Sequence, residues 1–394
     1  MKKLRIVMPL LGALLLAAAC HKSDFHYFYY DAKDYALLSQ YLNLPEKPDN
    51  YEAQLPKHLT VLGLAPRPVE QSLAILGRVL FYDKNLSKDK TISCASCHKQ
   101  QLAFADNAQV SKGVFERVGQ RNSIALGSVL NFSAYYGTDL FGASGIPFFW
   151  DNRANTASEQ NIASMTNPKE MDMTHDDIVA AVQAQPYYEP LFRMAFGNGE
   201  VTSDRVSKAI AEFVNAIGSY NSKFDHEAEK TIGANGYYSN INAEGLNFSG
   251  FTAAENHGKQ LYMANCAVCH SSTQGRPPKM KANNGLDATT VDAGVGGVTY
   301  DPADMGMFKV PLLRNIALTA PYMHDGRFAT LEEVVEHYSS GVQNHPNLSP
   351  ELRYGSAAKQ MHFTEIEKQD LVAFLKTLTD EELLTDTRFS DPFK

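Results

Sequence analysis

The chain has 394 residues, which is enough for two or three domains with hydrophobic cores of their own. Hydrophobic residues make up 44% of it and charged residues 20%, as in an ordinary soluble globular protein. The formal net charge of −8 gives a nucleic-acid-binding role no electrostatic support, so nucleic acid is excluded as a partner.

Residues 1–20 read as a lipoprotein signal peptide rather than a folded element. A basic start is followed by an apolar run over residues 6–16, then by three alanines and Cys20. The run is short for a bilayer span, and a cysteine directly after small residues resembles a bacterial lipobox. We expect export with lipid on Cys20, which anchors the protein on the periplasmic side of the cell envelope. Plain secretion is the alternative.

The next segment differs in composition from the rest of the chain. Residues 21–60 are polar and aromatic with scattered prolines, and we interpret them as a tether followed by an irregular N-terminal arm. Farther along, apolar residues recur at helical spacing over residues 206–217, which predicts a helix with one buried face. A strong alternating strand pattern appears nowhere. The expected fold class is therefore mainly α.

Three further helices are predicted by their start signals. Thr252, Thr330 and Thr364 are each followed three positions later by glutamate, the pattern of a capping box. Glycine and proline cluster over residues 270–312, which indicates a long loop region. Long loops in a compact domain are usually functional or packed around a cofactor.

Four of the five cysteines lie in two copies of the pattern Cys-x-x-Cys-His. The copies are Cys94-Ala-Ser-Cys97-His98 and Cys266-Ala-Val-Cys269-His270. Two thiols about one helical turn apart can reach both vinyl groups of one porphyrin, and the following histidine points its imidazole at the iron. This is the signature of c-type haem attachment, and it predicts two covalently bound haem c groups. Disulfides, a thioredoxin-like redox motif and zinc binding are the alternatives.

The two pentads lie far enough apart in the sequence for one domain each. We expect two cytochrome c-like haem domains with long loops, each built around one porphyrin. The N-terminal haem domain is expected over residues 61–222 and the C-terminal haem domain over residues 223–394.

Several stretches outside the pentads also match a known family. They are Leu80-Phe-Tyr-Asp83, Leu86-Ser87, Arg121-Asn122-Ser123, Phe148-Phe-Trp-Asp-Asn-Arg153, Asn167-Pro-Lys-Glu-Met171, Val310-Pro-Leu-Leu-Arg-Asn315 and Leu318-Thr-Ala-Pro-Tyr-Met-His-Asp-Gly326. With both pentads, they resemble the bacterial di-haem cytochrome c peroxidase family, which includes the methylamine dehydrogenase maturation enzyme MauG. The resemblance covers roughly residues 70–380.

The resemblance implies roles for several residues. The haem on His98 is the peroxidatic one, and the haem on His270 is the electron relay. Trp150, the only tryptophan in the chain, matches the tryptophan between the haems; an indole is polarisable and oxidisable, which suits electron transfer. Glu170 matches the family's distal acid and Gln160 its distal amide. A carboxyl beside a buried porphyrin can move a proton between peroxide oxygens if its pKa is raised.

The family also binds a calcium ion between its haem domains. The matching ligands here are Asn122 and the backbone carbonyls of Thr319 and Pro321. An all-oxygen ligand set suits calcium. The alternative is that these residues only shape turns.

Many peroxidases of the family place a histidine on a loop before the Arg-Asn pair, where it blocks the first iron until the second haem is reduced. The matching position in this chain is Val114, and no histidine occurs between His98 and His175. Valine cannot ligate iron. We therefore expect the first haem to have an open or water-bound face without reductive activation.

The far-side ligand of the second iron is methionine in typical peroxidases and tyrosine in the MauG branch. The matching residue is Tyr338, and Met361, Met323 and the more distant His345 are the alternatives. An anionic phenolate favours higher oxidation states of iron than methionine does. MauG also has a surface tryptophan two residues before its second pentad, where this chain has Ala264.

The resemblance thus implies a di-haem peroxidase that reduces hydrogen peroxide with electrons from a donor protein such as a small cytochrome. A MauG-like oxidase of a protein or organic substrate is the alternative. A purely electron-transferring cytochrome is disfavoured, because both of its irons would need to be closed.

Overall fold

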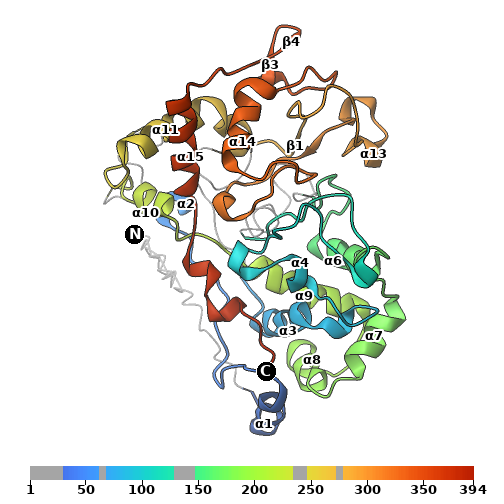
Figure 1. Ribbon diagram of the computed structural model, residues 1–394. Coiled ribbons are helices and arrows are strands. Elements are labelled where there is room, and N and C mark those ends of the chain that lie inside the picture. Colours follow the sequence, from blue (N-terminus) through green and yellow to red (C-terminus); the bar gives the residue numbers. More distant parts are fainter. Residues whose placement is uncertain (1–29, 62–67, 128–146, 234–245, 272–277) are drawn as a thin grey trace, which may run out of the picture.

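The computed structural model describes residues 30–61, 68–127, 147–233, 246–271 and 278–394, and there the chain is mainly helical. This confirms the expected fold class. Figure 1 shows the N-terminal half, in blue and green, below the C-terminal half, in yellow to red.

Helices account for most of the regular structure. In the N-terminal half they are α1 (Ala32–Tyr41), α2 (Lys57–Thr60), α3 (Gln71–Tyr82), α4 (Cys94–Cys97), α6 (Ala157–Thr166), α7 (His175–Gln183), α8 (Tyr188–Phe196) and α9 (Ser203–Ala216). In the C-terminal half they are α10 (Lys223–Glu229), α11 (Ala253–Asn265), α12 (Ala267–His270), α13 (Gly296–Thr299), α14 (Leu331–Glu336) and α15 (Glu365–Lys376). The short strands form two antiparallel pairs, β1 (Lys281–Ala282) with β2 (Phe308–Lys309) and β3 (Arg353–Tyr354) with β4 (Ala357–Ala358).

The start signals of three helices are confirmed. Thr252, Thr330 and Thr364 are the N-caps of α11, α14 and α15, and each forms the complete capping box with the glutamate three positions on. These boxes depend only on neighbouring residues, which is why the sequence alone predicts them.

Each half contains a pair of closely crossing helices, α3 with α9 and α11 with α15. Glycine makes both crossings possible. A Cβ on Gly77 of α3 would lie 1.9 Å from the carbonyl oxygen of Ala209, and a Cβ on Gly258 of α11 would lie 1.8 Å from that of Asp370. The second pentad follows α11 directly, and the first follows α3 after residues 83–93; they lie on α12 and α4. The two halves therefore repeat one helix arrangement around their haem-binding sequences.

Two separate hydrophobic cores correspond to the two halves. The first includes the apolar face of α9, with Val206, Ile210 and Phe213 fully buried as the sequence predicts. The second is formed by α11, α14 and α15 with residues of α10. The end of the chain departs from the expected domain boundary at residue 223. Leu383 and Phe389 belong to the first core, and Figure 1 shows the C-terminus beside α1 and α8.

The N-terminal arm is not wholly irregular, in contrast to the expectation for residues 21–60. Asp31 caps α1 by accepting a hydrogen bond from the amide of Lys33. Leu38 of this helix and the following Leu42 are buried in the first core. The sequence pattern of this helix is weak because Leu38 is its one buried residue.

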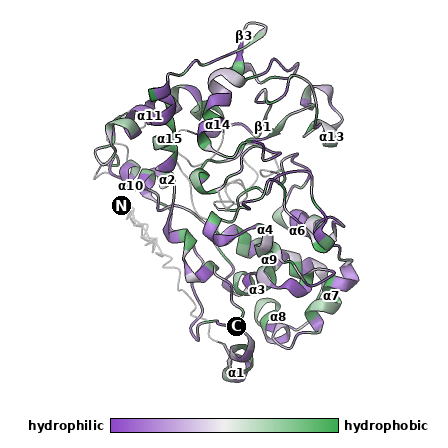
Figure 2. Ribbon diagram, viewed as in Figure 1, coloured by the Kyte–Doolittle hydropathy of each residue, from purple (hydrophilic) through white to green (hydrophobic). Residues whose placement is uncertain are grey.

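Hydropathy varies around the helices, which have one face packed on a core and another exposed to water. In Figure 2, α6 and α7 each carry both hydrophobic and hydrophilic residues, as helices with one buried face do. Over the part of the chain that the structure describes, the helices are too short or too polar to cross a membrane. Cys20, the expected lipidation site, lies outside the described residues.

Candidate functional site

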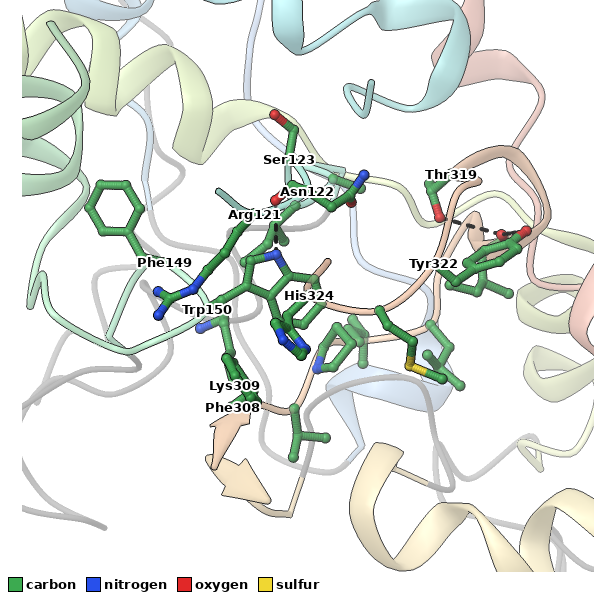
Figure 3. A pocket seen from close by; sticks show the side chains of 18 of the residues that line it. Arg121, Asn122, Ser123, Phe149, Trp150, Phe308, Lys309, Thr319, Tyr322 and His324 are labelled. Atoms are coloured by element: carbon green, nitrogen blue, oxygen red, sulfur yellow. Dashed lines mark hydrogen bonds between the residues drawn. The ribbon is translucent and has the colours of Figure 1, made fainter. Parts of the chain in front are cut away.

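A cavity of about 710 Å³ lies between the two halves, and both pentads contribute to its wall. The expected site residues that line it are Trp150, Gln160, Glu170, Asn122, Thr319, Pro321 and Tyr338. Figure 3 shows part of this wall, with Asn122, Trp150 and Thr319 labelled. The structure therefore brings into one space residues that are far apart in the sequence.

The pentad cysteines are free thiols, so the disulfide alternative does not fit. Burial raises the pKa of Cys94 and that of Cys266 to about 12, and the pKa of Cys97 to about 11. Thiol–disulfide exchange needs thiolates, which such burial disfavours. Among the described residues, no cluster of three or more histidine, cysteine or acidic side chains forms a zinc site. Paired thiols on the single turn of α4, facing a large cavity, fit thioether attachment of a porphyrin.

Both pentad histidines are oriented for binding iron. Nδ1 of His98 is hydrogen-bonded to the backbone carbonyl of Phe104 at 3.0 Å, and Nδ1 of His270 to that of Pro311 at 2.9 Å. A carbonyl partner fixes Nδ1 as the protonated nitrogen and leaves Nε2 as the basic one. Burial also lowers the pKa of both imidazoles, which keeps them neutral. The residues present therefore fit two haem groups.

A polar group gathers beside the first pentad. Glu170 accepts a hydrogen bond from the amide of Asn167 at 2.7 Å, and Gln160 donates to the hydroxyl of Ser164 at 3.0 Å. Burial raises the pKa of Glu170, while hydrogen bonds from Ser164 and Asn167 and the charge of Arg153 act in the opposite direction. A carboxyl with a raised pKa in a largely enclosed site is suited to proton transfer.

The loop that precedes the Arg-Asn pair packs behind this acid. The amide of Val114 donates to the backbone carbonyl of Glu170 at 2.8 Å, and the valine side chain is fully buried. A Cβ on Gly113 would lie 2.1 Å from the carbonyl oxygen of Lys169, so the two loops are in direct contact. Gly113, rather than Val114, lines the cavity. A side chain at position 114 thus points into the protein and not over the first haem site.

Trp150 is held from both halves of the molecule. Its indole Nε1 donates to the backbone carbonyl of Asn122 at 2.9 Å, and its own carbonyl accepts from the amide of Lys309 at 2.8 Å. Asn122 belongs to the N-terminal half and Lys309 to β2 of the C-terminal half. The ring lines the cavity that both pentads share (Figure 3).

The residues expected to bind calcium also meet at this cavity. The side-chain amide of Asn122 donates to the carbonyls of Ala108 and Gln109, at 3.1 and 3.3 Å. These two bonds fix the orientation of the Asn122 amide group. Thr319 and Pro321 line the same cavity.

Tyr338 lies beside the second pentad, on a π-helical turn over His337–Gly341 that continues α14. Such turns often mark functional sites. Burial raises the pKa of its phenol to about 12, and the neighbouring thiols of Cys266 and Cys269 also act on it. Met361 and Met323 line the cavity as well, so all three expected ligands are in reach of the site.

His345 does not share this cavity. Its Nε2 is hydrogen-bonded to Thr290 and its Nδ1 accepts from the amide of Asn347. Both ring nitrogens are therefore engaged elsewhere, and we set it aside as an iron ligand.

Sequence reasoning assigned no role to several residues at the site. Arg121 forms ion pairs with Asp151 at 2.5 Å and Asp292 at 2.8 Å, and so joins the two halves. Lys309 is buried in the cavity wall, and burial lowers its pKa to about 7. Arg121 lies in one of the stretches that carry the family resemblance, whereas nothing in the local sequence marks Lys309, because charged residues usually lie on the surface.

The sequence matches two protein-family models. Residues 71–231 match the family described as di-haem cytochrome c peroxidase. Residues 256–379 match the family described as cytochrome c. Each match contains one pentad.

Curated relatives cover most of the chain. The cytochrome c551 peroxidase of Nitrosomonas europaea is 35% identical over 321 residues, which is 81% of this chain and 83% of that protein. The methylamine utilization protein MauG of Methylorubrum extorquens is 35% identical over 326 residues, or 80% of each chain.

Solved structures agree with the fold. A MauG-like protein associated with microbial copper homeostasis is 33% identical, with a TM-score of 0.67 over 83% of this chain and 96% of that one. The di-haem peroxidase BthA from Burkholderia thailandensis is 21% identical, with a TM-score of 0.61 over 84% of this chain and 91% of that one. The second similarity supports the fold alone.

Proposed function

Since the chain belongs to the di-haem cytochrome c peroxidase and MauG family, we propose that it reduces hydrogen peroxide at the His98 haem with electrons relayed through Trp150 and the His270 haem. The enzyme is an oxidoreductase of the cytochrome c peroxidase type with covalently bound haem c. One observation carries the proposal: both pentads face one cavity, with Glu170 beside the first and Trp150 in the shared wall.

When bound, the haem groups supply two redox-active irons, one for the peroxide and one for storing electrons. Reduction of one hydrogen peroxide to two water molecules consumes two electrons and two protons. Glu170 is placed to accept the proton of the oxygen that binds and to return it to the oxygen that leaves as water. Its raised pKa keeps the transfer near balance in both directions. We assign the Gln160 amide to holding the peroxide by hydrogen bonds.

The first haem site is open on the side of Glu170. The loop that holds a blocking histidine in gated peroxidases is here hydrogen-bonded to the Glu170 backbone through Val114. Tyr338 is the proposed far-side ligand of the second iron, in a wall that it shares with Met361. These two features support a resting enzyme that needs no reductive activation.

The resting spectrum tests this function. The fully oxidised holoenzyme is expected to show one high-spin and one low-spin haem by electron paramagnetic resonance. It is also expected to react with hydrogen peroxide at once, without prior reduction, and to turn over with a reduced small cytochrome as donor. Two low-spin haems and no reaction with peroxide would refute the open first site and leave an electron-transfer role.

A MauG-like oxidase of a protein or organic substrate is the second candidate. Tyr338 beside the second pentad favours it. The two candidates differ in their use of a donor. A peroxidase consumes peroxide in proportion to the cytochrome it oxidises, whereas an oxidase oxidises little cytochrome and consumes peroxide in proportion to its own substrate, which supplies the electrons.

We further propose that calcium binds at Asn122, Thr319 and Pro321, supported by the fixed orientation of the Asn122 amide. We also propose that the mature protein is anchored to the cell envelope on its periplasmic side through lipid on Cys20, supported by the sequence of the first 20 residues. Elemental analysis of the purified holoenzyme tests the first proposal, and the intact mass of the mature protein tests the second.

A further inference from the structure

Ser164 lies between the two residues proposed to handle the peroxide. It follows Gln160 by one turn of α6 (Ala157–Thr166), so both side chains project from one face of the helix into the cavity. Its hydroxyl accepts a hydrogen bond from Nε2 of Gln160 at 3.0 Å, and as a hydrogen-bonding partner it lowers the pKa of the nearby Glu170 carboxyl. One small side chain thus connects the amide and the acid.

A serine or threonine within a helix commonly bonds back to the carbonyl four residues earlier. Thr166 on the same helix does so, with its hydroxyl donating to the carbonyl of Ile162 at 2.8 Å. Ser164 has side-chain partners instead. Because its oxygen accepts from the Gln160 amide, its single proton is available to the Glu170 carboxylate. The direction of donation therefore runs from the amide through the hydroxyl to the acid.

Asn167 completes the setting of the acid. Its amide donates to Oε1 of Glu170 at 2.7 Å, and its own Oδ1 accepts from the amide of Lys169 at 2.9 Å. Asn167 is thus fixed to the backbone of its own loop, whereas Ser164 reaches the carboxyl from the neighbouring helix. Two donors from two elements fix the orientation of the carboxyl group.

We propose that Ser164 is a positioning residue of the peroxide site, which holds the Glu170 carboxylate and the Gln160 amide in a fixed relation facing the first haem. This inference rests on the proposed function and adds a residue to it. Ser164 touches neither iron nor peroxide in the proposal; it acts through Glu170 and Gln160.

The inference predicts a change in the titration of Glu170. A donor stabilises the ionised carboxylate, so removing it raises the pKa. Arg153 is the charged group that faces Glu170, and it lowers the pKa in both wild type and variant. The thiols of Cys94 and Cys97 also interact with Glu170, but as thioethers in the holoenzyme they do not titrate. The shift is therefore attributable to position 164.

The experiment compares Ser164→Ala with Ser164→Thr and with Thr166→Val in the fully oxidised holoenzyme. The first reading is the pH profile of the second-order rate constant for reaction with peroxide. Glu170 must be ionised to accept the first proton, so Ser164→Ala is expected to move the acidic limb to higher pH by about one unit, a tenfold loss of rate below the limb. Ser164→Thr keeps the hydroxyl, so its acidic limb is expected at the wild-type pH. Thr166→Val is also expected to leave the acidic limb at the wild-type pH.

The second reading does not depend on activity. The carbonyl stretch of protonated Glu170, identified by its loss in Glu170→Gln, is titrated by infrared difference spectroscopy. Its midpoint should rise by the same amount in Ser164→Ala. Alanine favours helices, so the variant is expected to fold. An unshifted midpoint with an unshifted limb would overturn the inference even where Glu170→Gln still slows the reaction. A fast Glu170→Gln would instead remove Glu170 from the proposed function, and the infrared midpoint would still decide the role of Ser164.

Discussion

Glu170 depends on its partners for its chemistry. Burial raises the pKa of its carboxyl, and the hydrogen bonds from Ser164 and Asn167 offset part of that effect. A carboxyl balanced in this way can both accept and return a proton, which an exposed carboxylate does less well. In the proposed function, Glu170 alone exchanges the proton, and Ser164 and Asn167 adjust the pKa of its carboxyl.

Replacing Glu170 tests this balance. Glu170→Gln keeps the size of the side chain and removes its proton exchange, so we expect peroxide turnover to fall by roughly 100-fold or more with both haems retained. Stopped-flow kinetics of the oxidised enzyme measures the effect. Glu159→Gln is the matched control, since Glu159 is an exposed carboxylate on α6, the helix that carries Gln160. A Glu170→Gln enzyme as fast as this control would show that another group moves the proton.

At the scale of elements, the positions of the pentad segments depend on two helix crossings at which only glycine fits. The pairs α3–α9 and α11–α15 approach each other at Gly77 and Gly258. The second pentad comes directly after α11, so a displaced α11 also displaces the residues that hold a porphyrin. The crossings therefore matter for the cofactor as well as for the cores.

Gly258→Ala is expected to destabilise the C-terminal half. The added Cβ would meet the backbone of Asp370 at 1.8 Å, and a backbone atom cannot yield as a flexible side chain can. Overpacking of this kind costs about 1–3 kcal/mol. Thermal unfolding followed by circular dichroism should show a lower midpoint than wild type. Gly119→Ala is the control, because its Cβ would meet only a carbonyl oxygen at 4.0 Å; equal midpoints for the two variants would argue against close packing at Gly258.

At the scale of the whole molecule, Trp150 lies in a seam that joins the halves. Besides its own bonds to Asn122 and Lys309, the seam contains the Arg121–Asp292 ion pair, with two contacts of 2.8 Å. In the proposed function, an electron that crosses from the second haem site to the first passes through this region. The same contacts that hold the halves together therefore hold the indole in place.

Trp150→Phe is expected to separate the two haem sites functionally. Phenylalanine fills much of the space but is harder to oxidise and lacks the indole N–H that binds Asn122. The first reaction with peroxide should stay near the wild-type rate. Electron transfer from the second haem should slow by about tenfold, which equals about 1.4 kcal/mol of activation free energy. Rapid-mixing spectra that follow each haem separately check this, and unchanged transfer would place the electron path elsewhere.

The sequence predicts those features of the structure whose interacting residues lie close together along the chain. The pentads and the boxes at Thr252 and Thr364 are local patterns, so their geometry follows from a few neighbours. The family resemblance located Glu170 and Trp150. It did not reveal the role of Ser164 between Glu170 and Gln160, because no matched stretch includes Ser164.

Other features could not be predicted because their interacting residues lie far apart along the chain. The orientation of Val114 depends on the loop around Glu170, some 56 positions away (170 − 114). The burial of Lys309 depends on both halves closing around one cavity. Only the folded chain brings such residues together, and no spacing rule in the sequence encodes them.

The C-terminal segment packs into the first core, and this affects the order in which the two cores can form. The side chain of Arg78 donates to the carbonyl of Ser390 across 312 positions, and Gln100, two residues after the first pentad, donates to the carbonyl of Leu383. Loops of that length close slowly, and synthesis begins at the other end. The second core uses nothing beyond residue 378 among its buried members, whereas the first needs residue 389. The pentad made first thus belongs to the core that only the end of the chain completes.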